Sequence, residues 1–174
     1  MNYNNILLIS EQTLKADSLI NDNVDNQYIL PAITLAQDTG LQPLIGTKLF
    51  QKLQKLVNDA EIGLAANAIY KTLLDDYVTP FMEYKTMVEI QIPLSYKYRN
   101  MGIVQTSDER VANSQMRDIQ YLIDYYDNKS TFYANRMTDW LCANAQSLPE
   151  YRNSDTVADM NANNKAYNTG IFLG

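Results

Sequence analysis

Histidine is absent from this chain of 174 residues, and its absence excludes several kinds of active site. Many serine and cysteine hydrolases activate their nucleophile with an adjacent histidine, and histidine is the commonest ligand of zinc, iron and copper. Neither arrangement can form here. We therefore expect no catalytic residue, no metal ligand and no cofactor, and we predict that the protein is not an enzyme.

Cysteine is nearly absent, since Cys142 is the only one. A lone cysteine cannot form a disulfide within its own chain. It lies beside Trp140 and Leu141 in an apolar helical segment, where a cysteine usually behaves as a small hydrophobic residue. We therefore predict that Cys142 is buried and unreactive.

Long apolar runs and an excess of positive charge are also lacking. No run approaches the ~18 apolar residues that a membrane-spanning helix needs, and the formal net charge is −6. Binding to the phosphates of DNA or RNA requires a basic surface. The first residues have no basic segment ahead of their apolar run, so no secretory signal is expected. These features predict a protein that neither spans a membrane nor binds the phosphates of nucleic acid.

What the sequence does contain is helical periodicity along most of its length. Ser10 and either Asp25 or Asn26 are suitable N-caps for two helices near the start of the chain. Gly40 is predicted to end the second of these helices. Pro31 fits that helix only if it lies in the first turn, where no backbone hydrogen bond is lost.

The stretch QPLIGTKLF, residues 42–50, is either a loop that binds phosphate or the start of a helix. A phosphate loop needs more glycines, a preceding strand, and a serine or threonine after its lysine, all of which are missing. We therefore predict a tight turn through Gly46 in which Thr47 caps the following helix. Leu44 and Ile45, just ahead of the cap, are placed to pack against its first turn.

Two features divide the rest of the chain. Pro80 is predicted to kink a helix or to start a new one, and Gly102 is predicted to lie at the turn of a loop. From Met116 to Leu141 apolar positions recur in steps of three and four if Ser130 is counted with them, which predicts one long helix. Apart from the few residues of GIVQT, no alternating pattern typical of a strand is present. The fold class is therefore predicted to be all-α: a compact helical bundle with one long C-terminal helix and extended terminal arms.

A change of composition near residue 151 predicts two parts. Residues 1–151 form the helical domain, and residues 152–174 form an extended C-terminal arm. The arm is polar as far as Lys165, but it ends with apolar side chains that suit docking onto a partner: Tyr167, Ile171, Phe172 and Leu173. The alternative is a terminus that contacts nothing.

Pairs of acidic residues are the candidates for carboxylate chemistry. Examples are Asp75 with Asp76, and Asp124 with Asp127. Two acids on one helix face can bind a divalent cation or transfer protons, but the helices of an acidic protein carry such pairs by default. We therefore interpret them as solvated surface residues.

Several segments occur in an order that resembles a known family. They are the helix ending in ITLAQ, the turn LQPLIGTKLFQKL, the helix bearing LLDDYVTPFMEY, the loop RNMGIVQ and the long helix closing in YANRMTDWLCANAQSLPEY. Together they resemble the head-to-tail connector (adaptor) proteins of tailed bacteriophages, most of all the ring protein of crAss-like phages. The resemblance covers about residues 6–151. The turn Leu44 to Thr47 and the proline at Pro80 match as structural features.

The resemblance implies a structural virion protein and not an enzyme. It implies a homo-oligomeric ring, a dodecamer if it follows portal symmetry, between the portal protein and the next tail or ring protein. DNA then passes through the ring without sequence-specific binding, which suits an acidic chain. The location that it implies is the head–tail junction of the virion, after assembly in the cytoplasm of the host bacterium.

Two alternatives from other classes stay open at this point. One is a small helical enzyme that binds a metal through carboxylates, although such bundles characteristically use Glu-x-x-His pairs. The other is a small helical regulator that binds one protein partner as a monomer. Metal-dependent turnover would favour the first alternative, and a single copy per complex would favour the second.

Overall fold

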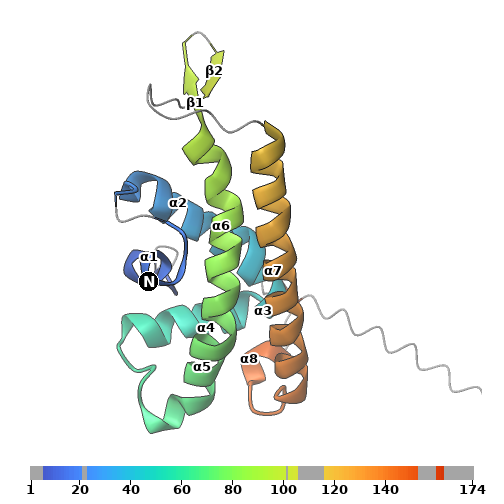
Figure 1. Ribbon diagram of the computed structural model, residues 1–174. Helices are drawn as coiled ribbons and strands as arrows, with labels where there is room; N and C mark the ends of the chain where they lie inside the picture. Colours follow the sequence, from blue (N-terminus) through green and yellow to red (C-terminus); the bar gives the residue numbers. More distant parts are fainter. Residues whose placement is uncertain (1–5, 21–22, 101, 106–115, 153–159, 163–174) are drawn as a thin grey trace, which may run out of the picture.

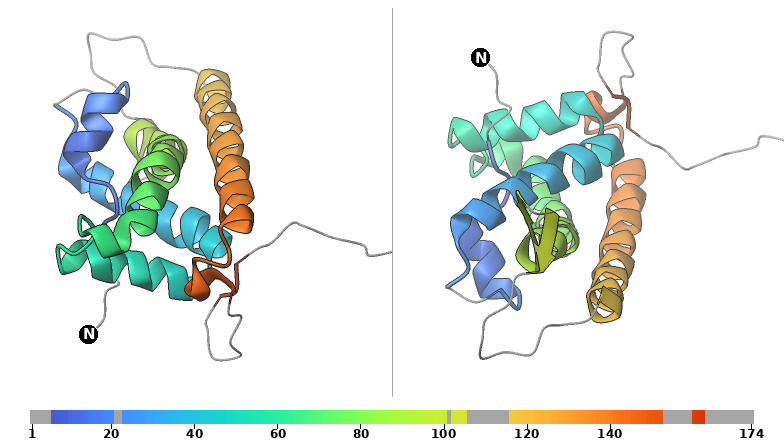
Figure 2. Two further views of the ribbon diagram at one scale, coloured as in Figure 1. Left: turned by 90° about the horizontal axis from the view of Figure 1, so that it is seen from below. Right: turned by 90° about the horizontal axis from the view of Figure 1, so that it is seen from above.

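An antiparallel pair of long helices, α6 (Thr79–Ser95) and α7 (Met116–Ala143), forms the centre of the fold in the computed structural model (Figure 1). The structure describes residues 6–20, 23–100, 102–105, 116–152 and 160–162. In Figure 2, α6 lies between α7 on one flank and the N-terminal helices on the other. The described chain is all-α apart from one short hairpin, as the sequence predicts.

The first two helices begin where the sequence places their caps. Helix α1 (Glu11–Asp17) follows Ser10, whose Oγ accepts a hydrogen bond of 3.0 Å from the backbone N–H of Thr13. Helix α2 (Asn26–Leu35) follows Asp25, whose carboxylate accepts one of 3.0 Å from the N–H of Gln27. Each cap satisfies a backbone donor that the first turn of a helix leaves free, so both predictions are confirmed.

The predicted end of the second helix is wrong. Helix α2 continues into a π-helical segment, η1 (Ala36–Leu41), and then into α3 (Gln42–Ile45), so the helical path passes through Gly40. A Cβ on Gly40 would lie 3.0 Å from Cγ of Lys85. Gly40 therefore allows close packing against α6 instead of ending a helix.

The predicted position of Pro31 is also wrong, because this proline lies inside α2 and not in its first turn. A proline there removes one backbone hydrogen bond. The face that carries Ile29 and Ile33 is completely buried in the core. Burying two such side chains contributes about 3–6 kcal/mol, which offsets the cost of about 3 kcal/mol that a proline imposes inside a helix.

The middle of the chain is a run of short helical segments that leads into α6. Helix α4 (Thr47–Asn58) is followed by η2 (Ala65–Asn67), α5 (Ala68–Leu73) and the π-helical segment η3 (Leu74–Val78). Pro80 lies in the first turn of the α-helical segment α6, a position that proline favours, and η3 leads into that turn with helical backbone angles. The proline thus starts a new α-helical segment at the end of η3, which is one of its two predicted effects.

The predicted loop around Gly102 is instead a two-stranded antiparallel hairpin. Strand β1 (Tyr96–Arg99) pairs with β2 (Gly102–Gln105), with Tyr96 opposite Gln105 and Arg99 opposite Gly102. Gly102 is therefore the first residue of a strand and directly follows the turn. Tyrosines alternate with basic residues in β1, and β2 contains the adjacent β-branched residues Ile103 and Val104. Both residue types favour the extended backbone that the loop interpretation overlooked.

Helix α7 is a single helix of 28 residues, about 42 Å long. It passes through the segment DNKS without a break, and Ser130 is buried with its hydroxyl donating to the backbone carbonyl of Asp127 at 2.9 Å. The predicted long helix is confirmed. Cys142, however, is exposed, because it follows Leu141 by one residue and so is turned about 100° away from the buried face.

The core joins side chains from the segment before α1 and from each α-helix. Its largest completely buried members are Leu14, Ile29, Ile33, Leu41, Ile45, Leu49, Leu53, Leu56, Leu73, Met82, Ile90 and Met137. Two buried glutamines fix the start of the chain to this core. The side-chain amide of Gln37 accepts from the N–H of Leu8 at 2.6 Å, and that of Gln54 donates to the carbonyl of Ile6 at 3.1 Å. Residues 6–8 are therefore held against the helices.

Candidate functional site

Stacked aromatic rings join the α6 side of the molecule to α7. Tyr77 stacks on Trp140 with 4.9 Å between the ring centroids, and Tyr84 stacks on Tyr133 at 5.3 Å. The paired positions are seven residues apart on each chain segment, which is two helical turns. Aromatic pairs of this geometry add about 0.5–1.5 kcal/mol each beyond the area they bury. The stacks therefore fix how α7 is rotated, and so decide which of its side chains point outward.

The outward side of α7 carries aromatic side chains. Tyr121 and Phe132 are 71% and 61% exposed, and Tyr125 between them is also exposed. The spacing of four and then seven residues puts all three on one helix face, opposite the buried Ile119 and Met137. We call these three residues the outer aromatic face. In both views of Figure 2, α7 stands at the edge of the molecule.

Scattered apolar residues are normal on protein surfaces, whereas a large contiguous apolar patch is typical of an interaction site. Three exposed rings on one face of one helix make the outer aromatic face the candidate contact surface of the described chain. The spacing is visible in the sequence. It escapes notice there because the same helix has a stronger apolar pattern on its buried face.

A turn and a later segment meet at the start of α4. The N–H of Thr47 donates to the carbonyl of Met160 at 2.9 Å, and the N–H of Met160 donates to Oγ1 of Thr47 at 3.0 Å. The side-chain amide of Gln42 also donates to this oxygen, at 2.8 Å. Thr47 is thus the first residue of α4 and not its N-cap, because its hydroxyl binds a distant segment instead of the helix's own backbone.

Gly46 makes this contact possible. Its φ of +80° and ψ of 153° belong to a region that is almost restricted to glycine. A Cβ at this position would lie 2.9 Å from the backbone nitrogen of Ala162, which is closer than real side chains approach. Of its neighbours in the predicted turn, Ile45 is completely buried and Leu44 is half-buried against the core. The turn therefore receives residues 160–162 of the same chain.

One protein family matches most of the chain, including both sides of this contact. Residues 41–161 match a family of unknown function, DUF6712. The chain belongs to this family. The matched part begins just before the Gly46 turn and ends beside Met160, so it contains both sides of the contact. No curated protein matches the chain, and no solved structure matches it.

The DUF6712 description names no activity, so the connector function stays a prediction. The docking residues predicted at the end of the chain, Tyr167, Ile171, Phe172 and Leu173, lie outside the described residues. Of the predicted C-terminal arm, the structure describes Arg152 and residues 160–162. Arg152 ends the short helix α8 (Pro149–Arg152), one residue beyond the predicted domain boundary.

The acidic pairs of this DUF6712 member lie on exposed helix surface. Asp75 forms an ion pair with Lys71 one turn earlier, and both side chains are half-exposed. Asp124 accepts a hydrogen bond of 2.8 Å from Gln120, and Asp127 lies 3.9 Å from Lys85. Among the residues that the structure describes, no three acidic or cysteine side chains form a group that could hold a metal ion. No helix in the described ranges is long and apolar enough to cross a membrane.

Proposed function

We propose that this protein is a structural subunit of the head-to-tail connector of a tailed bacteriophage. Identical copies form a ring between the portal protein and the next tail or ring protein, and DNA passes through it. The observation that carries the proposal is the outer aromatic face of α7. The resemblance of the sequence to phage connectors suggests what covers that face, namely a neighbouring copy.

The outer aromatic face has the physical character of a subunit contact. Burying one large aromatic side chain contributes about 1.5–3 kcal/mol. Tyr121, Tyr125 and Phe132 lie on one stiff helix that is already fixed against α6, so little conformational entropy is lost when they bind. Aromatic residues of this kind provide most of the energy in many protein interfaces.

A ring requires that one face of a subunit meets a different face of the next. The flank opposite α7 is formed by α1 and α2 (Figure 2). Helix α2 carries two exposed leucines, Leu30 and Leu35, so α2 has apolar side chains available for a contact as α7 does. In the ring that we propose, the outer aromatic face of one copy covers the α2 flank of the next.

Electron microscopy of the particle from which this chain comes is the direct test. We expect density for this chain to encircle the axis between head and tail, with α7 at the contact between neighbouring subunits. Absence of the chain from the particle, or a single copy away from the axis, would overturn the proposal. A single copy would instead favour the monomeric regulator.

A double variant tests the face itself. Tyr121→Ser with Phe132→Ser removes two exposed rings, so we expect a folded subunit that does not enter the ring. The matched control is Asn128→Ser, which changes an exposed polar residue near the same face and removes no apolar area. Normal incorporation of the double variant would show that this face is not a subunit contact.

A further inference from the structure

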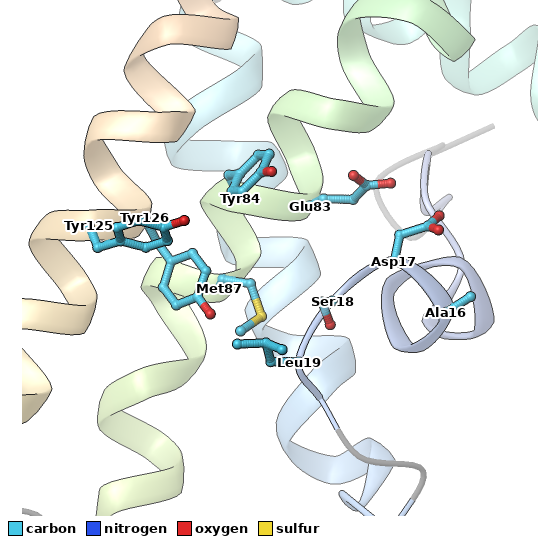
Figure 3. A pocket seen from close by; sticks show the side chains of 9 residues that line it. All are labelled: Ala16, Asp17, Ser18, Leu19, Glu83, Tyr84, Met87, Tyr125 and Tyr126. Atoms are coloured by element: carbon cyan, nitrogen blue, oxygen red, sulfur yellow. The ribbon is translucent and has the colours of Figure 1, made fainter.

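A cleft of about 370 Å³ lies beside α6, between the end of α1 and helix α7 (Figure 3). Residues 16–19 form one wall, and Tyr125 and Tyr126 of α7 form the other. Glu83, Tyr84 and Met87 of α6 lie between these walls. Three segments that are far apart in the sequence thus build one hollow, at the small end of the size range of ligand sites.

Two carboxylates lie on one side of the cleft. In Figure 3 the side chain of Glu83 points from α6 toward α1, where Asp17 is found. Glu83 is half-buried and Asp17 is exposed. Among the described residues, no lysine or arginine forms an ion pair with either of them. The cleft therefore contains negative charge that the described part of the chain does not compensate.

The surroundings of Glu83 make that charge unfavourable in the free protein. Burial, and then the nearby charge of Asp17, raise the pKa of Glu83 to about 7. A positive group in the cleft would favour the charged form of Glu83 and offset the repulsion from Asp17. The site is thus electrostatically prepared for a cation.

Three tyrosines, Tyr84, Tyr125 and Tyr126, also line the cleft. Aromatic faces attract cations, and tyrosine hydroxyls accept hydrogen bonds from them. One ring of the set already shows this preference, since Nζ of Lys129 lies 5.6 Å from the ring centroid of Tyr125. Carboxylates beside tyrosines are a lining that recognises an organic cation better than a neutral or anionic group.

We propose that this cleft binds an arginine side chain of a partner protein. An arginine carries a planar cation that both pairs with carboxylates and stacks on aromatic rings, on a stem that suits Met87 and Leu19. A protein is favoured over a free small molecule because the apolar surface continues outside the cleft. Leu19 at its rim is 87% exposed, and Tyr125 belongs to the outer aromatic face.

This inference goes beyond the connector proposal and does not depend on it, since any protein partner can supply the arginine. Residues 16–19 lie outside the part of the chain that matches the family, whereas the α6 and α7 residues lie within it. If the subunits formed no oligomeric ring, the cleft and its lining residues would be unchanged. The two proposals can therefore fail separately.

The test is a nuclear magnetic resonance titration of the purified full chain with a blocked Gly-Arg-Gly peptide. We expect the methyl signal of Met87 to shift and saturate, with a dissociation constant of about 1 mM, as suits one side chain. The comparison peptide contains citrulline, which has the shape of arginine without its charge. We expect it to bind at least about tenfold more weakly.

Two variants assign the binding to the carboxylates. Glu83→Gln and Asp17→Asn each replace a carboxyl group by a neutral amide of similar shape, and each is expected to weaken arginine binding severalfold to tenfold. Asp139→Asn, an exposed position elsewhere on α7, is the matched control for net charge and should bind as the unchanged protein does. Equal binding of the citrulline peptide, unchanged binding by both cleft variants, or no saturable shift of Met87 would each overturn the proposal.

Discussion

Helices α4 and α7 have similar inner faces and different outer faces. Both bury a continuous apolar stripe, with Leu49, Leu53 and Leu56 on α4 and with Met137 and Leu141 on α7. The exposed positions of α4 include Gln51, Lys55 and Asn58, which is the ordinary polar surface of an amphipathic helix. Exposed positions of α7 include the three rings of the outer aromatic face.

The difference between the two helices distinguishes residues that the fold requires from residues that are available to bind a partner. An inner face must be apolar for the chain to fold, and both helices satisfy that requirement. The outer face of a helix is free to be polar, and α4 shows that this chain does use polar residues there. We therefore infer that the three aromatic residues on the outer face of α7 are not required for its fold and serve contact with another molecule.

The largest expected effect tests this separation directly. Replacing Leu53 of α4 or Met137 of α7 by alanine should lower the free energy of unfolding by about 2–5 kcal/mol, because each leaves a cavity in the core. Replacing Lys55 or Phe132 by alanine should change it by no more than about 0.5 kcal/mol. Urea unfolding of the four variants measures this. A loss of stability in Phe132→Ala as large as in Met137→Ala would remove the distinction between the two faces of α7.

An intermediate effect is expected where α4 begins. Gly46→Ala places a Cβ in a glycine-only conformation and against Ala162, so we expect a loss of about 1–3 kcal/mol in thermal or urea unfolding. Gly63→Ala is the matched control, because nothing lies within 4 Å of its Cβ position. It should be neutral within about 1 kcal/mol. The same substitution in a chain that lacks residues 160–174 separates the two causes. If the loss of stability were just as large there, the backbone conformation of residue 46 alone, and not the clash with Ala162, would explain it.

The smallest expected effect concerns the pH dependence of stability at the cleft. Burial, and then the charge of Asp17 of α1, raise the pKa of Glu83 from its ordinary value of 4.5 to about 7 in the folded chain, and the tyrosines of α6 and α7 line the same cleft. The folded state thus favours the protonated form. Its stabilising contribution is fully present below about pH 4.5 and is lost as the pH rises through 7.

Glu83→Gln should remove this pH dependence and make the variant more stable than the unchanged chain at pH 8. Because Glu83 is only half-buried, water screens its charge, and we expect about 1 kcal/mol, or roughly 2–4 °C in melting temperature. Melting curves at pH 5 and pH 8 measure the difference. An equal pH dependence in both proteins would show that Glu83 titrates normally.

Local chemistry accounts for the predictions that succeeded. Ser10 and Asp25 cap helices through their own side chains, and the apolar steps of α7 continue without a break through Ser130. Such features depend on residues within a few positions of one another. The same reasoning failed at Pro31, Gly40 and Thr47, where distant packing outweighs local preference. Thr47 would be a sound N-cap if Met160 did not occupy its hydroxyl.

The sequence by itself determined that this protein is helical, that its C-terminal helix is long, and that this chain supplies no histidine. Those properties follow from residue type and from periodicity along the chain. Only the tertiary structure decided that Cys142 is exposed, that residues 160–162 lie on the Gly46 turn, and that Asp17 and Glu83 share a cleft. Each of these depends on how helices are rotated and brought together. That rotation is fixed by contacts between residues far apart in the sequence, such as the stacking of Tyr77 on Trp140.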